Sequence, residues 1–328
     1  MTVTLNLFIV LVALLIEAAF GYPGFVFRRI THPVVWIGAL LDRLEARLNQ
    51  PSMPEGKRRL NGLMALAALL IASLTPAIAL QYALFLLLPS ILAVTILALL
   101  ASTLIAQASL YRHVQAVAMA LEQHGLEAGR AAVAEIVGRD TETLDSSGVA
   151  RAGIESLAEN FSDGVVAPAF WGAIGGLPGM AAYKAVNTAD SMIGHLTPRH
   201  SAFGWGAAKL DDALNLPASQ LAALWITLAA LFHRDGRASA ALITVRRDAR
   251  HHRSPNAGWP EAAMAGALAL KLAGPRSYHG AFIEDAWIGA GRSEATAGDI
   301  RRALSLYKTA CALQIATYGL LALLIALA

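Results

Sequence analysis

The chain has 328 residues, of which 56% are hydrophobic and only 15% are charged. Soluble proteins carry about 25% charged residues, so this composition indicates an integral membrane protein and excludes an ordinary soluble enzyme. The formal charge of +3 is small, and the cations stand in blocks beside apolar stretches, which is typical of membrane topology rather than of a nucleic-acid-binding surface. We therefore expect the lipid bilayer, and no nucleic acid, as a partner.

The N-terminal residues 3–20 form the first predicted membrane span. No lysine or arginine precedes Arg28, and Glu17 interrupts the apolar run, so the segment lacks the pattern of a secretory signal peptide and is expected to be retained. Cys311 is the only cysteine, which excludes an intrachain disulfide and a cysteine-based zinc site.

Residues 21–59 form a loop with seven cations and three acids, which predicts a cytoplasmic position. His32, in THPVVWIG, is a weak candidate for a functional turn, although a His-Pro pair at a helix start is more often structural. Residues 60–110 contain no charge and are long enough for two spans of about 20 residues. We expect their tight turn between Thr75 and Pro89.

From Tyr111 to Asp163 the chain has nine acids and four cations, which predicts a polar, helical, cytoplasmic insertion. Asp145, Ser146 or Ser147 could cap the next helix. On that helix four charged residues recur every four positions and so share a face, namely Arg151, Glu155, Glu159 and Asp163. Neighbouring carboxylates repel one another unless a divalent cation or cationic partners bind them. The alternative is a solvent-exposed acidic face balanced by Arg151.

Residues 164–183 are uncharged but contain five glycines and two prolines, which favours a broken or re-entrant segment. Close helix packing through the glycines is the alternative. Residues 213–232 and 309–328 are further apolar stretches, and the loop 233–308 carries twelve cations and seven acids. If both basic loops are cytoplasmic, then segments 164–183 and 213–232 either both cross the membrane or both fail to cross fully.

Two polar clusters flank residue 200. In YKAVNTADSMIGH, Lys184, Asn187 and Ser191 have helical spacing, with Asp190 and His195 nearby, and a lysine with amides on one face suits phosphate oxygens. In FGWGAAKLDDALNLP the polar positions are Lys209, Asp211, Asp212 and Asn215. The pair Asp211 and Asn215 is spaced for magnesium ligands, although two acids at a membrane boundary can also cap a helix.

A third cluster, VRRDARHHRSPNAGWP, combines arginines with a Ser-Pro-Asn turn before a helix. Its candidate residues Arg247, Asp248, Ser254 and Asn256 could form an anion cradle, and the alternative is an ordinary basic cytoplasmic loop. The chain has no GxxxxGK[ST], GxGxxG, HExxH or GxSxG motif, so a nucleotide, if used, is not held by a P-loop.

Taken together, GRDT, RAGIESLAENFSDGVVAPAFW, GGLPGMAAYKAVNTADSMIGH, FGWGAAKLDDALN and RDARHHRSPNAGWPEAAMAGAL closely resemble the CobD/CbiB family. Its members are the membrane-bound adenosylcobinamide-phosphate synthases of cobalamin biosynthesis. The resemblance runs from about His32 to the C-terminal span. One departure is Lys209, where the family commonly has arginine, which puts a bidentate phosphate contact there in doubt.

The resemblance implies that adenosylcobyric acid is joined through an amide to (R)-1-aminopropan-2-ol O-phosphate or ethanolamine phosphate. It also implies ATP as co-substrate and a corrinoid as substrate rather than cofactor. We hypothesise that Glu155, Glu159 and Asp163 bind Mg²⁺, that Lys184 and Arg247 neutralise phosphate, and that Asp190 is the base. Glu155, Glu159, Lys184 and Asp190 are thus the expected catalytic residues. The expected substrate-binding residues are Arg151, Ser156, Asn160, Asn187, Ser191, His195, Lys209, Asp211, Asp212, Asn215, Arg247, Asp248, Ser254 and Asn256.

The expected fold is an all-α polytopic membrane protein with broken or re-entrant helices around a polar site and with cytoplasmic helical insertions. We expect three segments, 1–110, 111–216 and 217–328, in the bacterial inner membrane, with the site facing the cytoplasm and other cobalamin-pathway enzymes as possible partners. Two other readings stay open: a non-catalytic membrane sensor like the distantly related AmpE proteins, and a transporter. A transporter predicts flux across sealed vesicles, whereas a ligase predicts product formation in detergent.

Overall fold

The structure, a computed structural model, describes residues 3–22, 32–138, 140–278, 281–283 and 285–327. Helices dominate, and the described residues contain six helical stretches long and apolar enough to cross a membrane. These stretches are Val3–Phe20, Glu55–Leu87, Ser90–Gln123, Ser146–Ile193, Trp205–Phe232 and Ala297–Leu327. The predicted all-α polytopic membrane protein is therefore confirmed.

The chain divides into two compact units, each built from segments that are not contiguous in sequence. Unit 1 comprises residues 1–106, 167–215 and 317–328, and unit 2 comprises residues 107–166 and 216–316. Two of these boundaries fall within a few residues of the predicted boundaries at 110 and 216. The division into three consecutive segments stays a prediction.

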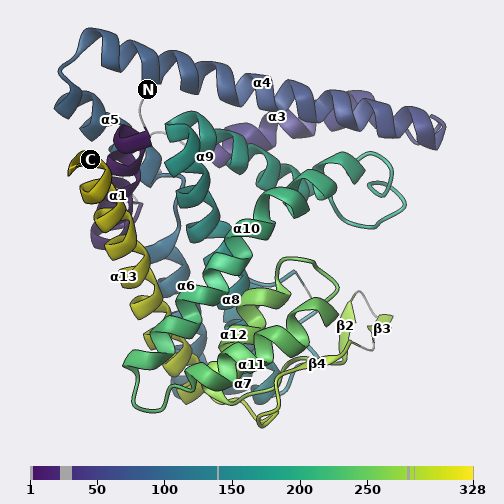
Figure 1. Ribbon diagram of the computed structural model, residues 1–328. Helices are drawn as coiled ribbons and strands as arrows, with labels where there is room; N and C mark the ends of the chain where they lie inside the picture. The colour runs from purple at the N-terminus through teal and green to yellow at the C-terminus, as the bar shows by residue number, and fades with distance from the viewer. Residues whose placement is uncertain (1–2, 23–31, 139, 279–280, 284, 328) are drawn as a thin grey trace. The chain divides into compact units, whose positions relative to one another are not determined.

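Unit 1 contains helices α1 (Val3–Phe20), α3 (Pro33–Leu48), α4 (Glu55–Leu87), α5 (Ser90–Ser102) and α9 (Ala167–Ile193), with the first part of α10 (Trp205–Ala229) and the last turns of α13 (Ala297–Leu327). Helix α1 packs against α5 and α9, and α4 packs against α3 and α9 (Figure 1). The hydrophobic core of unit 1 includes Leu41, Leu69, Val186 and Phe203.

The uncharged stretch 60–110 folds differently from two equal spans. Helix α4 runs for 33 residues with Pro76 inside it, and α5 has only 13 residues. The turn between them falls at Leu88 and Pro89, at the edge of the predicted interval. Pro89 ends the regular run because its ring disfavours a helical conformation in the preceding residue.

The predicted break in segment 164–183 is confirmed at Gly176, where φ is 63° and ψ is −149° inside α9. Backbone groups that the break leaves without helical partners bond to side chains instead. The N–H of Leu177 donates to Gln81 Oε1 at 2.9 Å, and Asn6 Nδ2 donates to the carbonyl of Ile174 at 3.1 Å. A re-entrant path through the membrane stays a prediction.

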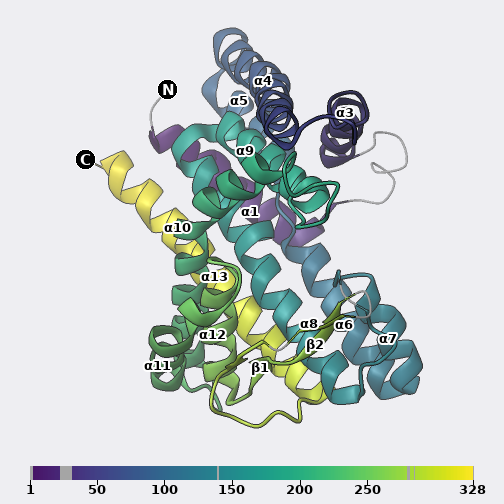
Figure 2. The same cartoon turned by 90° about the vertical axis from the view of Figure 1, so that its right-hand side faces the viewer.

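Unit 2 contains α6 (Gln107–Gln123), α7 (Gly125–Ala134), α8 (Ser146–Phe161), the π-helical turn η1 (Ser162–Val166), the 3-10 turns η2 (Ala230–Phe232) and η3 (Ala249–His251), α11 (Ala238–Asp248) and α12 (Gly258–Leu268). The second part of α10 and the first part of α13 complete it. Helices α11 and α12 lie side by side (Figure 2). They approach closely at Gly266, where a Cβ atom would lie 2.6 Å from Ala241 Cα.

Unit 2 also contains short strands that the sequence did not predict. Strand β1 (Leu272–Ala273) pairs with β4 (Trp287–Ile288), and β2 (Arg276–Tyr278) pairs with β3 (Ala281–Ile283), both antiparallel. Strands of two or three residues are too short to show the alternating pattern from which a strand is recognised.

Candidate functional site

A continuous chain of hydrogen bonds joins α9 to α10 within unit 1, and we term it the α9–α10 polar network. It consists of Tyr183, Lys184, Asn187, Asp211 and Asn215. Tyr183 Oη donates to Asn215 Oδ1 at 2.8 Å, and Asn215 Nδ2 donates to Asp211 Oδ2 at 2.8 Å. Asn187 Nδ2 reaches Asp211 Oδ1 at 3.4 Å, and Lys184 Nζ reaches Asn187 Oδ1 at 3.5 Å. Two of the predicted clusters are thus brought together.

Two polar members of this network are buried, and their polar atoms therefore need hydrogen-bond partners within the protein. Asn215 is fully buried, and Asp211 is only 7% exposed. A carboxylate so placed needs hydrogen bonds from its surroundings, and the two asparagines supply them. Asp190 and Asp212 both lie close enough to repel the charge of Asp211, so the network concentrates negative charge near one cation, Lys184. An ammonium group would be attracted to such a place.

Asp190 itself is held against a glycine. A Cβ atom at Gly194 would lie 1.9 Å from Asp190 Oδ1, so only glycine leaves room for the carboxylate in this position. Ser191 Oγ donates to the carbonyl of Asn187 at 2.9 Å, and His195 Nε2 lies 3.0 Å from the carbonyl of Ser191. Both contacts lie within α9 or just after it.

Tyr183 is the member of the network that the sequence did not single out. Its ring is 1% exposed. A signal was present, because Tyr183, Asn187 and Asp190 have i, i+4, i+7 spacing and so share one helical face. Lys209, by contrast, pairs with Asp212 at 3.5 Å on the exposed side of α10.

His32 caps α3, because its Nδ1 accepts the N–H of Val34 at 3.2 Å. Burial lowers the pKa of His32, and the charge of Lys184 lowers it further. The structural reading of the His-Pro pair is therefore confirmed.

In unit 2, two of the predicted functional carboxylates accept hydrogen bonds from the loop that carries β1 and β4. Glu155, 5% exposed, accepts the N–H of Ala273 at 2.8 Å, and Asp248, 7% exposed, accepts the N–H of Gly289 at 2.8 Å. The Arg247 guanidinium also donates to Asp248, at 2.5 and 2.6 Å, and holds the pKa of that carboxyl below its ordinary value. These contacts fix the loop.

The other predicted residues of unit 2 have mostly local partners. Ser156 Oγ donates to the carbonyl of Ile136 at 2.8 Å, and Asn160 Nδ2 donates to the carbonyl of Ser156 at 2.9 Å. Ser254 Oγ accepts the N–H groups of Asn256 and Ala257, both at 3.2 Å. This geometry is a serine turn that starts α12. Asn256 is 6% exposed.

The predicted magnesium ligands do not form a ready-made metal site. Within the described ranges, no group of three His, Cys, Asp or Glu side chains converges closely enough to hold an ion. Glu155 is buried and Glu159 is exposed, and Asp163 lies in the π-helical turn η1, where the four-residue spacing of an α-helix does not hold. Magnesium binding stays a prediction. That the polar residues of unit 1 and those of unit 2 form one shared site likewise stays a prediction.

Comparison with known proteins decides the family. The model of the CobD/Cbib protein family matches residues 10–307. The chain belongs to the CobD/CbiB family. A "Cobalamin biosynthesis protein CobD" from a Sinorhizobium species is 49% identical over 307 residues, which cover 93% of this chain and 94% of the relative. Proteins of the same name from Rhizobium meliloti and Rhodobacter capsulatus are 45% and 46% identical, covering 97% and 95% of this chain and 97% and 96% of their own.

No solved structure matches this chain significantly. The CobD/CbiB match covers all the motifs on which the resemblance rested, from the carboxylate row of α8 to the Ser-Pro-Asn turn. The chain is therefore a cobalamin biosynthesis protein of this family, with six helical stretches able to cross a membrane in its described part.

Proposed function

We propose that this protein is an adenosylcobinamide-phosphate synthase of the bacterial inner membrane. It joins a propionate carboxylate of adenosylcobyric acid to the amine of aminopropanol phosphate or ethanolamine phosphate. The α9–α10 polar network is the observation that carries the proposal, because it places a lysine, an amide and carboxylates side by side within a member of this family.

The reaction must activate a carboxylate, which is a poor electrophile. In the proposed route the carboxylate oxygen takes the terminal phosphoryl group of ATP, so that an acyl phosphate and ADP form. The amine of the aminoalcohol phosphate then attacks the acyl carbon, phosphate leaves, and the new amide nitrogen gives up a proton. Each turnover thus consumes one ATP and releases ADP, phosphate and a proton.

The residues of unit 1 have distinct tasks in this proposal. Lys184 neutralises phosphate oxygens, with Asn187 donating or accepting beside it. Asp190 takes the proton from the incoming ammonium, since it lies one helical turn from Asn187 on the same face of α9. Asp211, Asn215 and Tyr183 position Asn187 and keep its amide oriented toward Lys184.

The test is a mass-spectrometric assay of the purified chain supplied with adenosylcobyric acid, aminopropanol phosphate, ATP and Mg²⁺. We expect adenosylcobinamide phosphate from the wild type. Lys184→Met should lower kcat/KM by roughly 10²–10³, the usual loss when one group that stabilises developing charge is removed. Asp190→Asn should lower kcat by roughly 10²–10⁴, the usual contribution of a positioned base.

The matched control is Lys57→Met, which removes the same charge from an exposed position at the start of α4. This variant should keep wild-type turnover. If the wild type formed no product while adenosylcobyric acid bound tightly, the ligase would be rejected in favour of a sensor or carrier. Flux across sealed vesicles would then separate those two.

A further inference from the structure

Two adjoining pockets of unit 2 are lined by arginines. The larger has a volume of about 830 Å³ and the smaller about 390 Å³, and Arg234, Asp235, Gly236, Leu268 and Arg302 line both. The larger is also lined by Arg237 and Arg292, and the smaller by His233 and Arg301. We term them together the arginine basin. These volumes fall in the range of small-molecule sites.

The basin carries an excess of positive charge. In the larger pocket four guanidinium groups face two carboxylates, Asp235 in the lining and Asp299 behind it. Within the described part of the chain, the side chains of Arg234 and Arg237 make no hydrogen bond or ion pair. Asp235 is the acid that lines the pocket beside these two arginines, so positive charge remains in excess there, and an anion would reduce the repulsion between the guanidinium groups.

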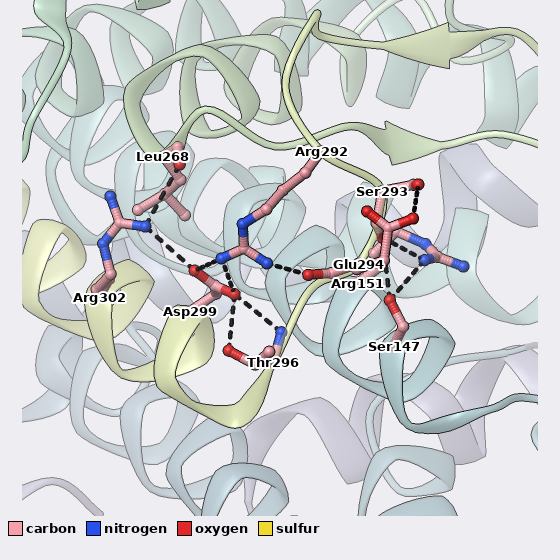
Figure 3. Close-up of polar contacts among 9 residues, drawn as sticks. All are labelled: Ser147, Arg151, Leu268, Arg292, Ser293, Glu294, Thr296, Asp299 and Arg302. Atoms are coloured by element: carbon pink, nitrogen blue, oxygen red, sulfur yellow. Dashed lines mark hydrogen bonds and ion pairs between the residues drawn. The ribbon is translucent and has the colours of Figure 1, made fainter.

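Arg292 and Arg302 are both held in place by one buried carboxylate (Figure 3), whereas Arg301 of the smaller pocket pairs with Glu122. Asp299, 2% exposed, accepts from Arg292 Nη2 at 2.6 Å and from Arg302 Nη1 at 3.1 Å. It also accepts the N–H and hydroxyl of Thr296, at 2.9 and 2.8 Å. Thr296 and Asp299 thus cap the start of α13, and the two guanidinium groups are fixed before any ligand arrives.

Two backbone contacts and one side-chain contact join the elements around the basin. The N–H of Arg237 donates to the carbonyl of Ala267 at 3.3 Å, and His233 Nε2 lies 2.9 Å from Thr309 Oγ1. The N–H of Arg292 donates to the carbonyl of Ala269 at 3.2 Å. The walls are therefore built by tertiary contacts and do not depend on a ligand.

The arginine basin lies next to the ends of two membrane-length helical stretches. It begins directly after Phe232, where one membrane-length stretch ends, and it includes the first turns of α13, where another begins. Leu231 and Phe232 are 66% and 70% exposed. Exposed apolar side chains followed at once by arginines are typical of the boundary between lipid tails and headgroups.

We infer that the arginine basin binds a phosphate-bearing anion at this boundary. Planar guanidinium groups pair with phosphate oxygens through two parallel N–H donors, and several of them converge here. The phosphate can come from the headgroup of an anionic phospholipid or from a soluble phosphate ester. None of the basin residues belongs to the α9–α10 polar network, so the inference goes beyond the proposed function.

The test measures anion binding by the full chain, purified in a neutral detergent, with isothermal titration calorimetry. One arm uses dihexanoyl phosphatidylglycerol, a water-soluble lipid with an anionic headgroup, and dihexanoyl phosphatidylcholine is its neutral counterpart. The other arm uses sodium pyrophosphate. Binding of the phosphatidylglycerol but not of pyrophosphate identifies a lipid headgroup as the source, and the reverse identifies a soluble phosphate.

The decisive variant is Arg234→Gln with Arg237→Gln, because neither side chain holds the fold together. The double variant should weaken anion binding by at least about tenfold. The loss of one hydrogen bond to a charged group by itself lowers affinity by roughly this factor. The matched control is Arg246→Gln with Arg250→Gln, which removes two exposed arginines of the α11 and η3 region that do not line the basin. It should leave affinity within about threefold.

Two results would overturn the inference. The first is that neither anion binds the wild type. The second is that the two double variants lose affinity equally, which would mean that the net charge attracts anions without a defined site. Product formation by the same preparations is measured separately, so that failure of the basin leaves the ligase proposal standing and failure of the ligase leaves the basin standing.

Discussion

At the scale of single residues, carboxylates in this protein act first as acceptors that fix the backbone or bind neighbouring cations. Glu45 of α3 illustrates this role in unit 1. It accepts from Arg199 Nε at 2.7 Å, from His200 Nε2 at 3.0 Å and from Asn49 Nδ2 at 3.3 Å. Burial by itself would raise the pKa of Glu45, but the hydrogen bonds from Arg199, His200 and Asn49 outweigh it and leave the pKa below its ordinary value.

This lowered pKa predicts a dependence of stability on pH. A carboxyl with a depressed folded pKa binds fewer protons in the native state, so its contribution is complete above the unfolded value of 4.5 and disappears as the pH falls through the folded pKa. Glu45→Gln should therefore cost about 1–2 kcal/mol at pH 7, reduced from the value for a buried pair because Arg199 is 59% exposed. Thermal unfolding midpoints should differ by roughly 2–5 °C at pH 7.

The same measurement at decreasing pH provides the check. As the pH falls from 4.5 through the lowered folded pKa of Glu45, the midpoints of wild type and Glu45→Gln should converge, because the native carboxylate becomes protonated over this range. Glu55→Gln, at an exposed position of α4, is the control and should follow the wild type at every pH. A difference that persisted unchanged into acid would show that Glu45 does not act through its charge.

At the scale of elements, helix α9 of unit 1 is interrupted at Gly176. With φ of 63° the position lies in a region that residues with a Cβ atom rarely adopt. A Cβ atom there would lie 2.5 Å from Gln81 Oε1 and 2.8 Å from Asn6 Oδ1. The amide side chains that satisfy the broken backbone thus occupy the space that a larger residue would need.

Gly176→Ala should destabilise the protein by about 2–4 kcal/mol, which combines a strained dihedral with displacement of a buried hydrogen-bonded amide. The adjacent Gly175→Ala is an unusually close control, because nothing lies within 4 Å of its Cβ position. It should be neutral or slightly stabilising, as alanine favours helix. Thermal unfolding of both variants in one detergent tests this, and equal midpoints would show that α9 can straighten at no cost.

The sequence predicted the elements better than their contacts. Apolar length and glycine content located the membrane stretches and the break in α9, since both follow from local composition. The pairing of Asp211 with Asn215 was also accessible from i, i+4 spacing. The partners of Glu155 and Asp248 were not, because Ala273 and Gly289 reach them only when distant parts of unit 2 fold together. Ala273 and Gly289 both have positive φ, at 56° and 94°, and no pattern in the sequence marks an alanine for that conformation.

At the scale of the whole chain, contacts within unit 1 restrict how the membrane can be crossed. Asn49 Nδ2 donates to the carbonyl of Arg199 at 3.0 Å, and Arg58 Nε donates to Asn49 Oδ1 at 2.8 Å. A Cβ atom at Gly62 would lie 1.9 Å from the carbonyl oxygen of Phe203. We therefore expect the segments around residues 49–58 and 194–204 to lie on the same side of the bilayer.

Three membrane-length stretches separate these two segments, namely Glu55–Leu87, Ser90–Gln123 and Ser146–Ile193. Three full crossings would leave the segments on opposite sides, so we expect an even number of full crossings between them. The stretch Ser146–Ile193 is the one interrupted by η1 and by Gly176. We therefore expect this stretch to enter the membrane and return to the side from which it entered. Broken helices do so where they line a protein-covered cavity.

Single-cysteine labelling tests this topology. Cys311→Ser gives a chain without cysteine, to which Ser52→Cys or Leu196→Cys is added, both at exposed positions. A membrane-impermeant maleimide should label both from the cytoplasmic face, in inside-out vesicles but not in intact spheroplasts, because the loop of residues 21–59 is basic. Cys311→Ser alone should remain unlabelled. Labelling of the two cysteines from opposite faces would contradict the contact between Asn49 and Arg199, whereas labelling from one face would leave the interrupted stretch as the place where the path of the chain turns back.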